Sequence, residues 1–397
     1  MLIYLLCLFI IFHQLIYQMF RPQIQKTRVL FLIALFNLSM VYFAANSYTK
    51  VKQIGYADKI KAVNNMNACL QNIRNHPSYI DNPEDIFNTG LLGVKTSLIT
   101  TKEDVDLTKK QSKVACTNPN FSAAIIEMFY ESGIQEGDYI AVSMTGSFPG
   151  ANIALLSACK AMNVKPVIIS SAGSSAWGAN RLDFSWPIIE SYLYKNQMID
   201  CKSSAYSIGG ANDLGDNLSY KGVEILSNTI FDVLDKNTEF VNEANLNKNI
   251  ERKMQIYKTF SKINDYSLYV NIGGGSASLG YGEQKDTMNV GLISPLDIEF
   301  NQSEQFKNSI AYEFLIEGIP MLNIKNINKL GPQYELYPPN KNLKVKEGVI
   351  FVKYAKYNLF VIIVGLVCSI SLILFIGIYS HLQIKRRMEG HEPESIM

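Results

Sequence analysis

The chain is poor in histidine. Its 397 residues include four, His13, His76, His381 and His391, and only His76 lies between the apolar segments near the two ends. A metal site built from histidines is therefore excluded by count. A Ser-His-Asp triad would depend on this one residue, which lies beside Pro77 in an expected loop. No CxxC pair is present, which argues against a zinc or thioredoxin-like site.

The chain also lacks an excess of charge and the common nucleotide motifs. Its formal net charge of +2 argues against a nucleic-acid partner, because nucleic-acid-binding domains usually carry a basic face. Its Gly-rich loops match neither the phosphate-loop pattern G-x-x-x-x-G-K-[ST] nor the dinucleotide pattern G-x-G-x-x-G. The hydrolase elbow G-x-S-x-G is missing as well. We therefore expect no cofactor.

Six cysteines are spread widely along the sequence. Two fall in apolar segments, and the other four lie between those segments: Cys7 and Cys368, then Cys69, Cys116, Cys159 and Cys201. An even number permits disulfides, but the spacing indicates no particular framework. Cys159 lies among apolar residues of an expected helix, where a buried free thiol is the usual state.

Three segments are apolar enough to consider as membrane helices. Leu359–Tyr379 carries no charge over a length that matches the roughly 20 residues needed to cross a bilayer. Val29–Asn46 is shorter, and Leu2–Tyr17 is interrupted by polar residues. We expect one or two transmembrane helices within residues 1–46 and another within 358–380.

Basic residues predict how these helices are oriented. One cluster lies between the first two segments and another follows the last: Arg21, Lys26 and Arg28, then Lys385, Arg386 and Arg387. Basic clusters beside membrane helices favour the cytoplasmic side. The sequence thus predicts a protein of the cytoplasmic membrane, with residues 47–357 outside the cytoplasm and a cytoplasmic tail at 381–397.

The segment between the membrane helices alternates strands with helices. Residues 47–75 look helical and amphipathic, and a regular core follows from about 118 to 330. Its expected strands are 138–144, 165–171, 266–272 and 319–324, and its expected helices are 121–133, 151–162, 220–236, 250–264 and 303–318, with Asn120 and Ser219 as N-caps. This alternation predicts an α/β fold, Rossmann-like in the broad sense, with a mostly parallel sheet flanked by helices.

Gly/Ser-rich loops follow the predicted strands. They are TGSFPG (145–150), SAGSSAWGAN (171–180) and GGGSASLGYG (273–282), with SIGGANDLGDNLS (207–219) as a further polar loop. Carboxyl ends of parallel strands meet at one edge of a sheet, where ligands bind. We expect one cleft there, although glycine after a strand can also serve only the turn.

The first loop suits an anion. Pro149 fits the first turn of a helix, which leaves the amides of Gly150, Ala151 and Asn152 at its positive end beside the Ser147 hydroxyl. The predicted ligand-binding residues are Gly146, Ser147, Gly150, Asn152, Ser174, Ser175, Trp177, Asn180, Asp213, Gly274, Gly275 and Ser276.

Charged residues near the loops leave two further interpretations open. A carboxylate-only site could use residues that otherwise serve as caps or solvated charges, namely Asp183, Asp213, Asp216, Glu283 and Asp286. A polyanion would need a basic groove, for which the candidates are Lys109, Lys110, Lys113, Lys160, Lys165 and Arg181.

Residues 117–180, from TNPNFSAAIIEMFY to SSAWGAN, resemble the central block of the bacterial poly-γ-glutamate system proteins. The resemblance includes TGLLGVKTSLITT upstream and SIGGANDLGDNLS, NIGGGSASLG and IPMLNIKNI downstream, and covers about residues 85–330. The apolar segment at 2–17 is additional to the family pattern. The family is membrane-anchored and is associated with poly-γ-glutamate synthesis and export. It supplies no established catalytic residues to transfer.

Three functional hypotheses follow. The first is a membrane-anchored component of poly-γ-glutamate (capsule or exopolymer) biosynthesis or export, which binds the carboxylate polymer or the proteins that make it. The second is an extracytoplasmic amide hydrolase or transferase with Ser147 as nucleophile and a lysine or carboxylate as base. The third is a phosphate-ligand binder of sensory type. All three include the lipid bilayer as a partner.

Overall fold

The structure, a computed structural model, forms two compact units. The globular domain is Lys52–Val352, and the terminal unit combines Met1–Val51 with Lys353–Met397. The residues described are 27–103, 106–282, 288–297 and 304–389.

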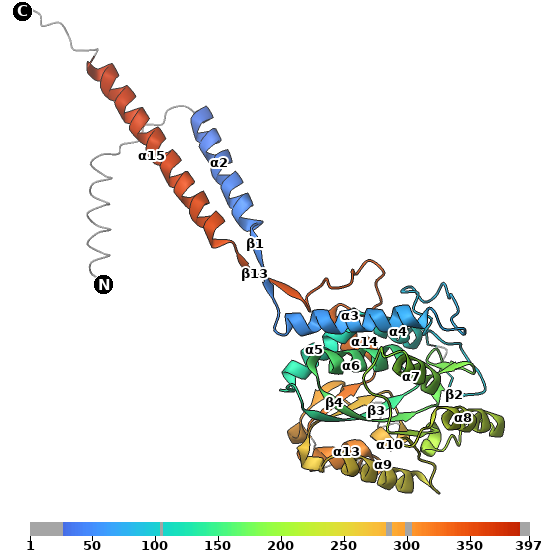
Figure 1. Ribbon diagram of the computed structural model, residues 1–397. Helices are drawn as coiled ribbons and strands as arrows, with labels where there is room; N and C mark the ends of the chain where they lie inside the picture. The colour runs from blue at the N-terminus through green and yellow to red at the C-terminus, as the bar shows by residue number, and fades with distance from the viewer. Residues whose placement is uncertain (1–26, 104–105, 283–287, 298–303, 390–397) are drawn as a thin grey trace, which may run out of the picture. The chain divides into compact units, whose positions relative to one another are not determined.

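Within the described residues, a seven-stranded sheet forms the centre of the globular domain (Figure 1). Its neighbours pair in parallel, except that the edge strand β11 is antiparallel to β12. In spatial order the strands are β11 (Gly291–Ile293), β12 (Met321–Ile324), β10 (Tyr266–Ile272), β3 (Tyr139–Thr145), β4 (Lys165–Ser171), β8 (Ala205–Ser207) and β9 (Glu239–Phe240). The predicted α/β fold with a mostly parallel sheet is confirmed.

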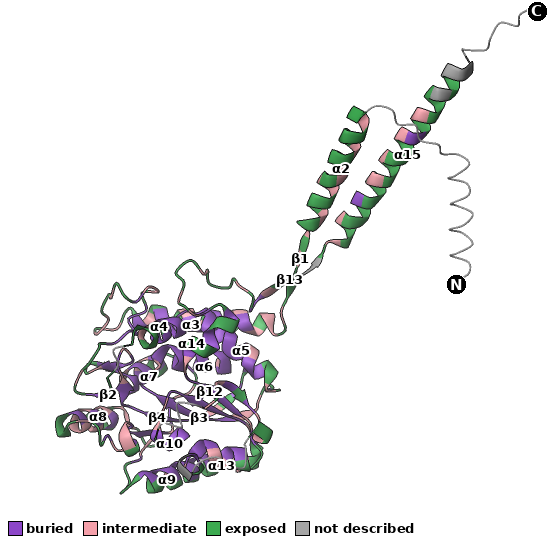
Figure 2. Ribbon diagram, turned by 180° about the vertical axis from the view of Figure 1, so that it is seen from behind, coloured by how far each residue is buried: buried purple, intermediate pink, exposed green. Residues whose placement is uncertain are grey.

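Helices cover both faces of this sheet, which explains why its central strands are almost continuously apolar. Side chains alternate along β3: Ile140 and Val142 join one hydrophobic cluster, and Ala141 joins another. The two helical layers lie above and below the sheet in Figure 2. The first contains α3 (Tyr56–Ile73), α5 (Asn120–Glu131), α6 (Pro149–Met162) and α7 (Trp186–Lys195), and the second contains α9 (Leu246–Phe260), α10 (Ser276–Leu279) and α13 (Ile310–Ile316).

The chain winds outward from β3 in two directions. It first adds β4, β8 and β9 on one side, then returns to place β10 and β12 on the other. The reversal therefore lies between β3 and β10. In open α/β sheets, ligands bind outside the carboxyl ends of the strands at such a reversal.

The register of the sheet brings the strand ends to one level. Ile324 pairs with Ile272, Ile272 with Met144, and Met144 with Ser170. The residues that come next along these four strands are Lys325, Gly273, Thr145 and Ser171. Two of the predicted Gly/Ser loops, those that leave β3 and β10, therefore start side by side at the reversal.

Two of the helix predictions need correction. Residues 47–75 do not form one helix, because β1 (Tyr48–Lys52) pairs with β13 (Val352–Tyr357) and α3 begins only after Gly55, which has a φ of +67°. Within the predicted helix 303–318, Ser309 accepts a hydrogen bond from the Tyr312 amide and starts a new helix, α13. Strands β8 and β9 and helix α7 lie outside the predicted elements.

The expected helix caps have different outcomes. Ser219 caps α8 (Tyr220–Val233), since its hydroxyl accepts a hydrogen bond from the Gly222 amide. Asn120 is instead the first residue inside α5. Its side-chain oxygen accepts a hydrogen bond from the Lys346 amide and is therefore used to hold a distant loop.

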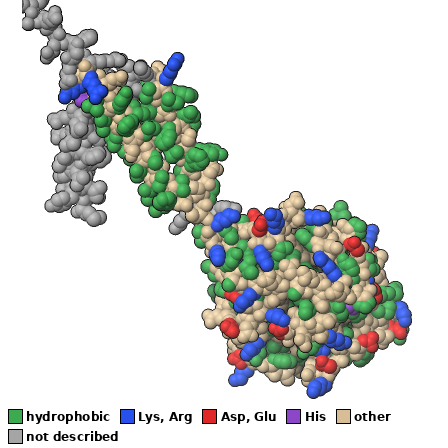
Figure 3. Space-filling model, turned by 45° about the horizontal axis from the view of Figure 1, so that its top comes forward, with side chains coloured by type: hydrophobic (Ala, Val, Ile, Leu, Met, Phe, Trp, Pro, Cys, Tyr) green, Lys and Arg blue, Asp and Glu red, His purple; other side chains and the backbone are tan. Residues whose placement is uncertain are grey.

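The terminal unit contains two long apolar helices. α2 (Thr27–Ala45) and the Leu359–Gln383 part of α15 (Leu359–Glu389) are long and apolar enough to cross a membrane, and they pack side by side. Hydrophobic side chains cover the helix pair in Figure 3. Tyr48 of β1 stacks on Tyr357 of β13 with ring centroids 5.1 Å apart. The apolar segment Leu2–Tyr17 lies outside the described residues.

The five cysteines that the structure describes are free thiols. Cys159 is fully buried, as expected for a thiol in the interior of α6. Burial raises the pKa of Cys69 to about 11 and that of Cys201 to about 12. These thiols are therefore protonated and unreactive near neutral pH.

Gly150→Val should destabilise the domain. A Cβ at Gly150 would lie 2.7 Å from the Cys116 carbonyl oxygen, where α6 packs on α4 (Leu107–Cys116). Overpacking of this kind costs about 1–3 kcal/mol. Thermal unfolding of the purified full-length protein measures the loss. Gly274→Ala is the control, since its Cβ would meet only the Lys325 side chain at 3.7 Å. Equal unfolding temperatures for the two variants would contradict this packing argument.

Candidate anion pocket at the strand ends

A pocket of about 330 Å³ opens at the carboxyl ends of the parallel strands. Thr145 of β3 and Ser171 of β4 line it, together with residues that follow β8, β10 and β12, namely Gly210, Gly274 to Ser276, and Lys325. The pocket therefore lies at the reversal between β3 and β10, where the fold predicts a ligand site.

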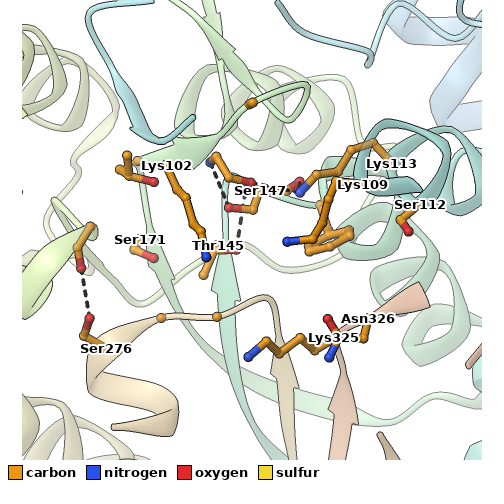
Figure 4. Close-up of a pocket in the computed structure, with 18 of the residues that line it drawn as sticks. Lys102, Lys109, Ser112, Lys113, Thr145, Ser147, Ser171, Ser276, Lys325 and Asn326 are labelled. Atoms are coloured by element: carbon orange, nitrogen blue, oxygen red, sulfur yellow. Dashed lines mark hydrogen bonds between the residues drawn. The ribbon is translucent and has the colours of Figure 1, made fainter. Parts of the chain in front are cut away.

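Four lysines are among the described residues that line the pocket, and none of those residues is aspartate or glutamate. Lys102 ends β2 (Thr100–Lys102), Lys109 and Lys113 belong to α4, and Lys325 follows β12. Figure 4 shows the amino groups of Lys102, Lys109 and Lys325 directed into the same space. Lys325 is buried while Lys102 and Lys109 are exposed, so Lys325 lies at the floor and the other two at the rim.

Helix α4 presents its basic residues to the pocket on one face. Asp106 caps the start of the helix, because its carboxylate accepts a hydrogen bond of 2.9 Å from the Thr108 amide. Lys109 and Lys113 are four residues apart and therefore share a face, which Ser112 also joins. The local sequence thus both starts the helix and places its basic residues on the face that lines the pocket.

Lys113 ties α4 to two of the Gly/Ser loops. Its Nζ donates to the Ser147 carbonyl oxygen at 2.6 Å and to Ser175 Oγ at 3.0 Å, and it lies 3.5 Å from the centroid of the Phe148 ring. Ser147 Oγ accepts a hydrogen bond of 3.0 Å from the Ser175 amide. The hydroxyl that contacts the Lys113 amine is therefore that of Ser175 and not that of Ser147.

Gly273 is required where β3 and β10 end side by side. Its φ is +100°, and a Cβ there would collide with Thr145 Oγ1. A side chain at this position would be strained and would push the two strand ends apart. The glycine therefore lets the loop after β10 turn directly into the pocket.

A buried ion pair holds the loop after β8, which forms one wall of the pocket. Asp213 has a φ of +62°, and its carboxylate accepts hydrogen bonds from Lys253 Nζ at 2.6 Å and from Ser207 Oγ at 2.9 Å. Both charged side chains are at most 5% exposed. On the pocket side, the Gly210 carbonyl accepts a hydrogen bond of 3.1 Å from Ser276 Oγ.

The structure brings five of the twelve predicted ligand-binding residues to the pocket wall. They are Ser147, Ser175, Gly274, Gly275 and Ser276. Gly146, Gly150, Asn152, Ser174, Trp177, Asn180 and Asp213 lie elsewhere. Several of these serve the protein itself: Asn180 bonds both backbone groups of Val94 and the Thr100 hydroxyl, and Trp177 packs 4.4 Å below the Lys110 ammonium group.

The expected use of the start of helix α6 needs correction. Asn152 is fully buried, its amide donates to the Phe148 carbonyl at 3.0 Å, and its side chain donates to the Thr145 carbonyl. Gly150 faces α4. These groups stabilise the turn between β3 and α6, so the pocket takes from this loop Ser147 and Phe148 instead.

The predicted basic groove is only partly assembled. Lys109 and Lys113 line the pocket, but the other four candidates do not. Three of them form ion pairs: Lys110 with Glu84, Lys160 with Asp200, and Arg181 with Asp183. Lys165 is the first residue of β4, at the amino ends of the strands and away from the pocket. Lys102 and Lys325 were absent from the prediction. The strand-end argument covers Lys325, which directly follows the predicted strand 319–324.

Two of the remaining titratable candidates, His76 and Asp216, are described by the structure, and neither lines the pocket. His76 packs against the rings of Phe184 and Tyr192, and desolvation lowers its pKa. Asp216 is exposed and accepts a hydrogen bond from the Asn212 side chain. The two other predicted carboxylates, Glu283 and Asp286, lie outside the described residues. Among those that are described, no group of three or more His, Cys, Asp or Glu side chains could hold a metal ion.

No family model, curated protein or solved structure matches the chain. Ammonium groups together with glycine backbone and serine hydroxyls can hold a ligand with several anionic oxygens, because charged donors form the stronger hydrogen bonds to such oxygens.

Asp213→Asn should reduce the free energy of unfolding by about 3–5 kcal/mol, because it leaves Lys253 buried without a counter-charge. Urea unfolding of the purified full-length protein measures the change. Asp216→Asn in the same loop is the control and should shift the value by no more than about 0.5 kcal/mol, since that side chain is exposed. Similar losses in the two variants would show that the ion pair does not hold the loop.

Proposed function

We propose that this protein is a membrane-anchored component of poly-γ-glutamate biosynthesis or export, and that the strand-end pocket binds the polymer. The α2 and α15 helices anchor it in a bacterial cytoplasmic membrane, and the Rossmann-like globular domain lies outside the cytoplasm. The observation that carries the proposal is the convergence of Lys102, Lys109 and Lys325 on one pocket.

The charge of the pocket supports a polyanionic ligand. The lysines come from β2, α4 and the end of β12, so three separate elements deliver positive charge to one space. Basic and acidic side chains are interspersed on the face of the domain shown in Figure 3. A carboxylate polymer therefore meets concentrated positive charge at the pocket, where field lines are focused by its walls.

A carboxylate ligand is favoured over a phosphate ligand for two reasons. The resemblance to poly-γ-glutamate system proteins that we infer from the sequence covers the segments that build the pocket. The proposed topology also places the pocket away from cytoplasmic nucleotides. A phosphate-ligand binder of sensory type is the weaker proposal, because the loops carry neither nucleotide fingerprint.

Amide hydrolysis or transfer is a second candidate, favoured by one contact. Lys113 Nζ lies 3.0 Å from Ser175 Oγ, within reach of a proton on that hydroxyl. Ser147 is the nucleophile expected from the sequence, but Lys113 donates a hydrogen bond to its backbone carbonyl and not to its hydroxyl. If the chain cleaves polymer, Ser175→Ala should abolish shortening of poly-γ-glutamate and Ser147→Ala should leave more activity. Gel analysis of polymer length after incubation distinguishes the two.

Lys325→Gln should weaken binding of poly-γ-glutamate about tenfold or more, because a hydrogen bond to a charged group contributes about 1.5–3 kcal/mol. The dissociation constant of the full-length protein in detergent, measured at low salt, tests this. Lys165→Gln removes the same charge at the amino end of β4, away from the pocket. This variant should bind the polymer as the unaltered protein does. Failure of the unaltered protein to bind the polymer would overturn the proposed function.

A further inference from the structure

The ends of a poly-γ-glutamate chain differ chemically from its interior. Each internal residue is joined through its side-chain carboxyl group and keeps one free carboxylate. The residue at the carboxyl end keeps two, and the residue at the other end carries an ammonium group beside its carboxylate. A site that concentrates positive charge in a small volume therefore has the most to gain from the carboxyl end.

The pocket has this concentrated charge and a limited volume. Its size of about 330 Å³ is near the lower bound of ligand pockets, which span roughly 300–1,000 Å³. Lys325 at the floor and Lys109 at the rim both extend into this space (Figure 4). One residue with two carboxylates can meet two of these amino groups together, whereas an internal residue brings a single carboxylate.

The lysines differ in exposure between the floor and the rim of the pocket, and this difference indicates the direction in which the polymer enters. Lys325 is 7% exposed and lies beside Gly274. A Cβ added at Gly274 would lie 4.0 Å from the Lys325 amine. Lys102 and Lys109 are exposed at the mouth. A chain that enters end first would place the two carboxylates of its last residue at Lys325 and Lys109, and the carboxylate of the residue before it would reach Lys102 at the mouth.

We propose that the pocket recognises the carboxyl end of a γ-linked glutamate chain, with Lys325 and Lys109 holding the two carboxylates of the terminal residue and Lys102 holding the carboxylate of the residue before it. This proposal rests on the proposed function, since it assumes that the ligand is poly-γ-glutamate. It adds that one protein binds one chain, at a defined end.

Two modified oligomers test this recognition. Both are γ-linked glutamate pentamers with one carboxyl group converted to an amide: the γ-carboxyl of the terminal residue in one, and the α-carboxyl of a central residue in the other. Their net charges are equal, so non-specific attraction is matched. Calorimetry with the full-length protein in detergent should show about tenfold or greater weakening for the first and at most about twofold for the second.

Polymer length and a pocket variant supply independent measurements. The number of proteins bound per chain should stay at one as the chain lengthens. In Lys325→Gln, the affinity difference between the two modified pentamers should disappear, because the partner of the terminal carboxylate is missing. In Lys165→Gln the difference should persist.

Each outcome separates this inference from the proposed function. Equal weakening by the two amides, or a stoichiometry that rises with chain length, would overturn recognition of the end and leave polymer binding intact. Absence of binding by the unmodified pentamer and by the polymer would overturn both. Loss of the affinity difference in Lys165→Gln as well would show that recognition of the terminal carboxylate does not depend specifically on Lys325.

Discussion

The site depends on the register of the parallel sheet. Pairing of β12, β10, β3 and β4 aligns Lys325, Gly273, Thr145 and Ser171 at one edge, although these residues are far apart in sequence. Backbone hydrogen bonds fix this alignment before any ligand is present. A shift of one residue in any of these strands would turn its side chains to the opposite face and dismantle the pocket floor.

The parts of the fold that depend on local sequence could be predicted well. Continuous apolar runs indicated β3, β4 and β10, and Gly/Ser loops after them indicated the edge where the pocket lies. Short strands such as β8 and β9 carry too few residues for a clear pattern, and both lie outside the predicted set. Strand β1 exists only because it pairs with β13, which lies near the other end of the chain. No local sequence pattern could therefore predict it.

The site itself was harder to predict, because its charge comes from distant packing. Lys102 reaches the pocket through the pairing of β2 with β5 (Ser174–Ser175), and α4 is held against α6 by the close approach at Gly150. Asn152 and Asn180 looked like ligand donors, since short amide side chains next to glycine often are. Both instead satisfy backbone groups that the turns leave unpaired.

The β1 and β13 ribbon closes the chain into a loop whose two ends lead to separate apolar helices. The domain Lys52–Val352 is thus an insertion within a helical hairpin, and neither of its ends is free. In a membrane that holds both α2 and α15, a single proteolytic cut in a surface loop would leave each fragment attached through its own helix. Release of the domain into the surrounding medium would require two cuts, one on each side of it.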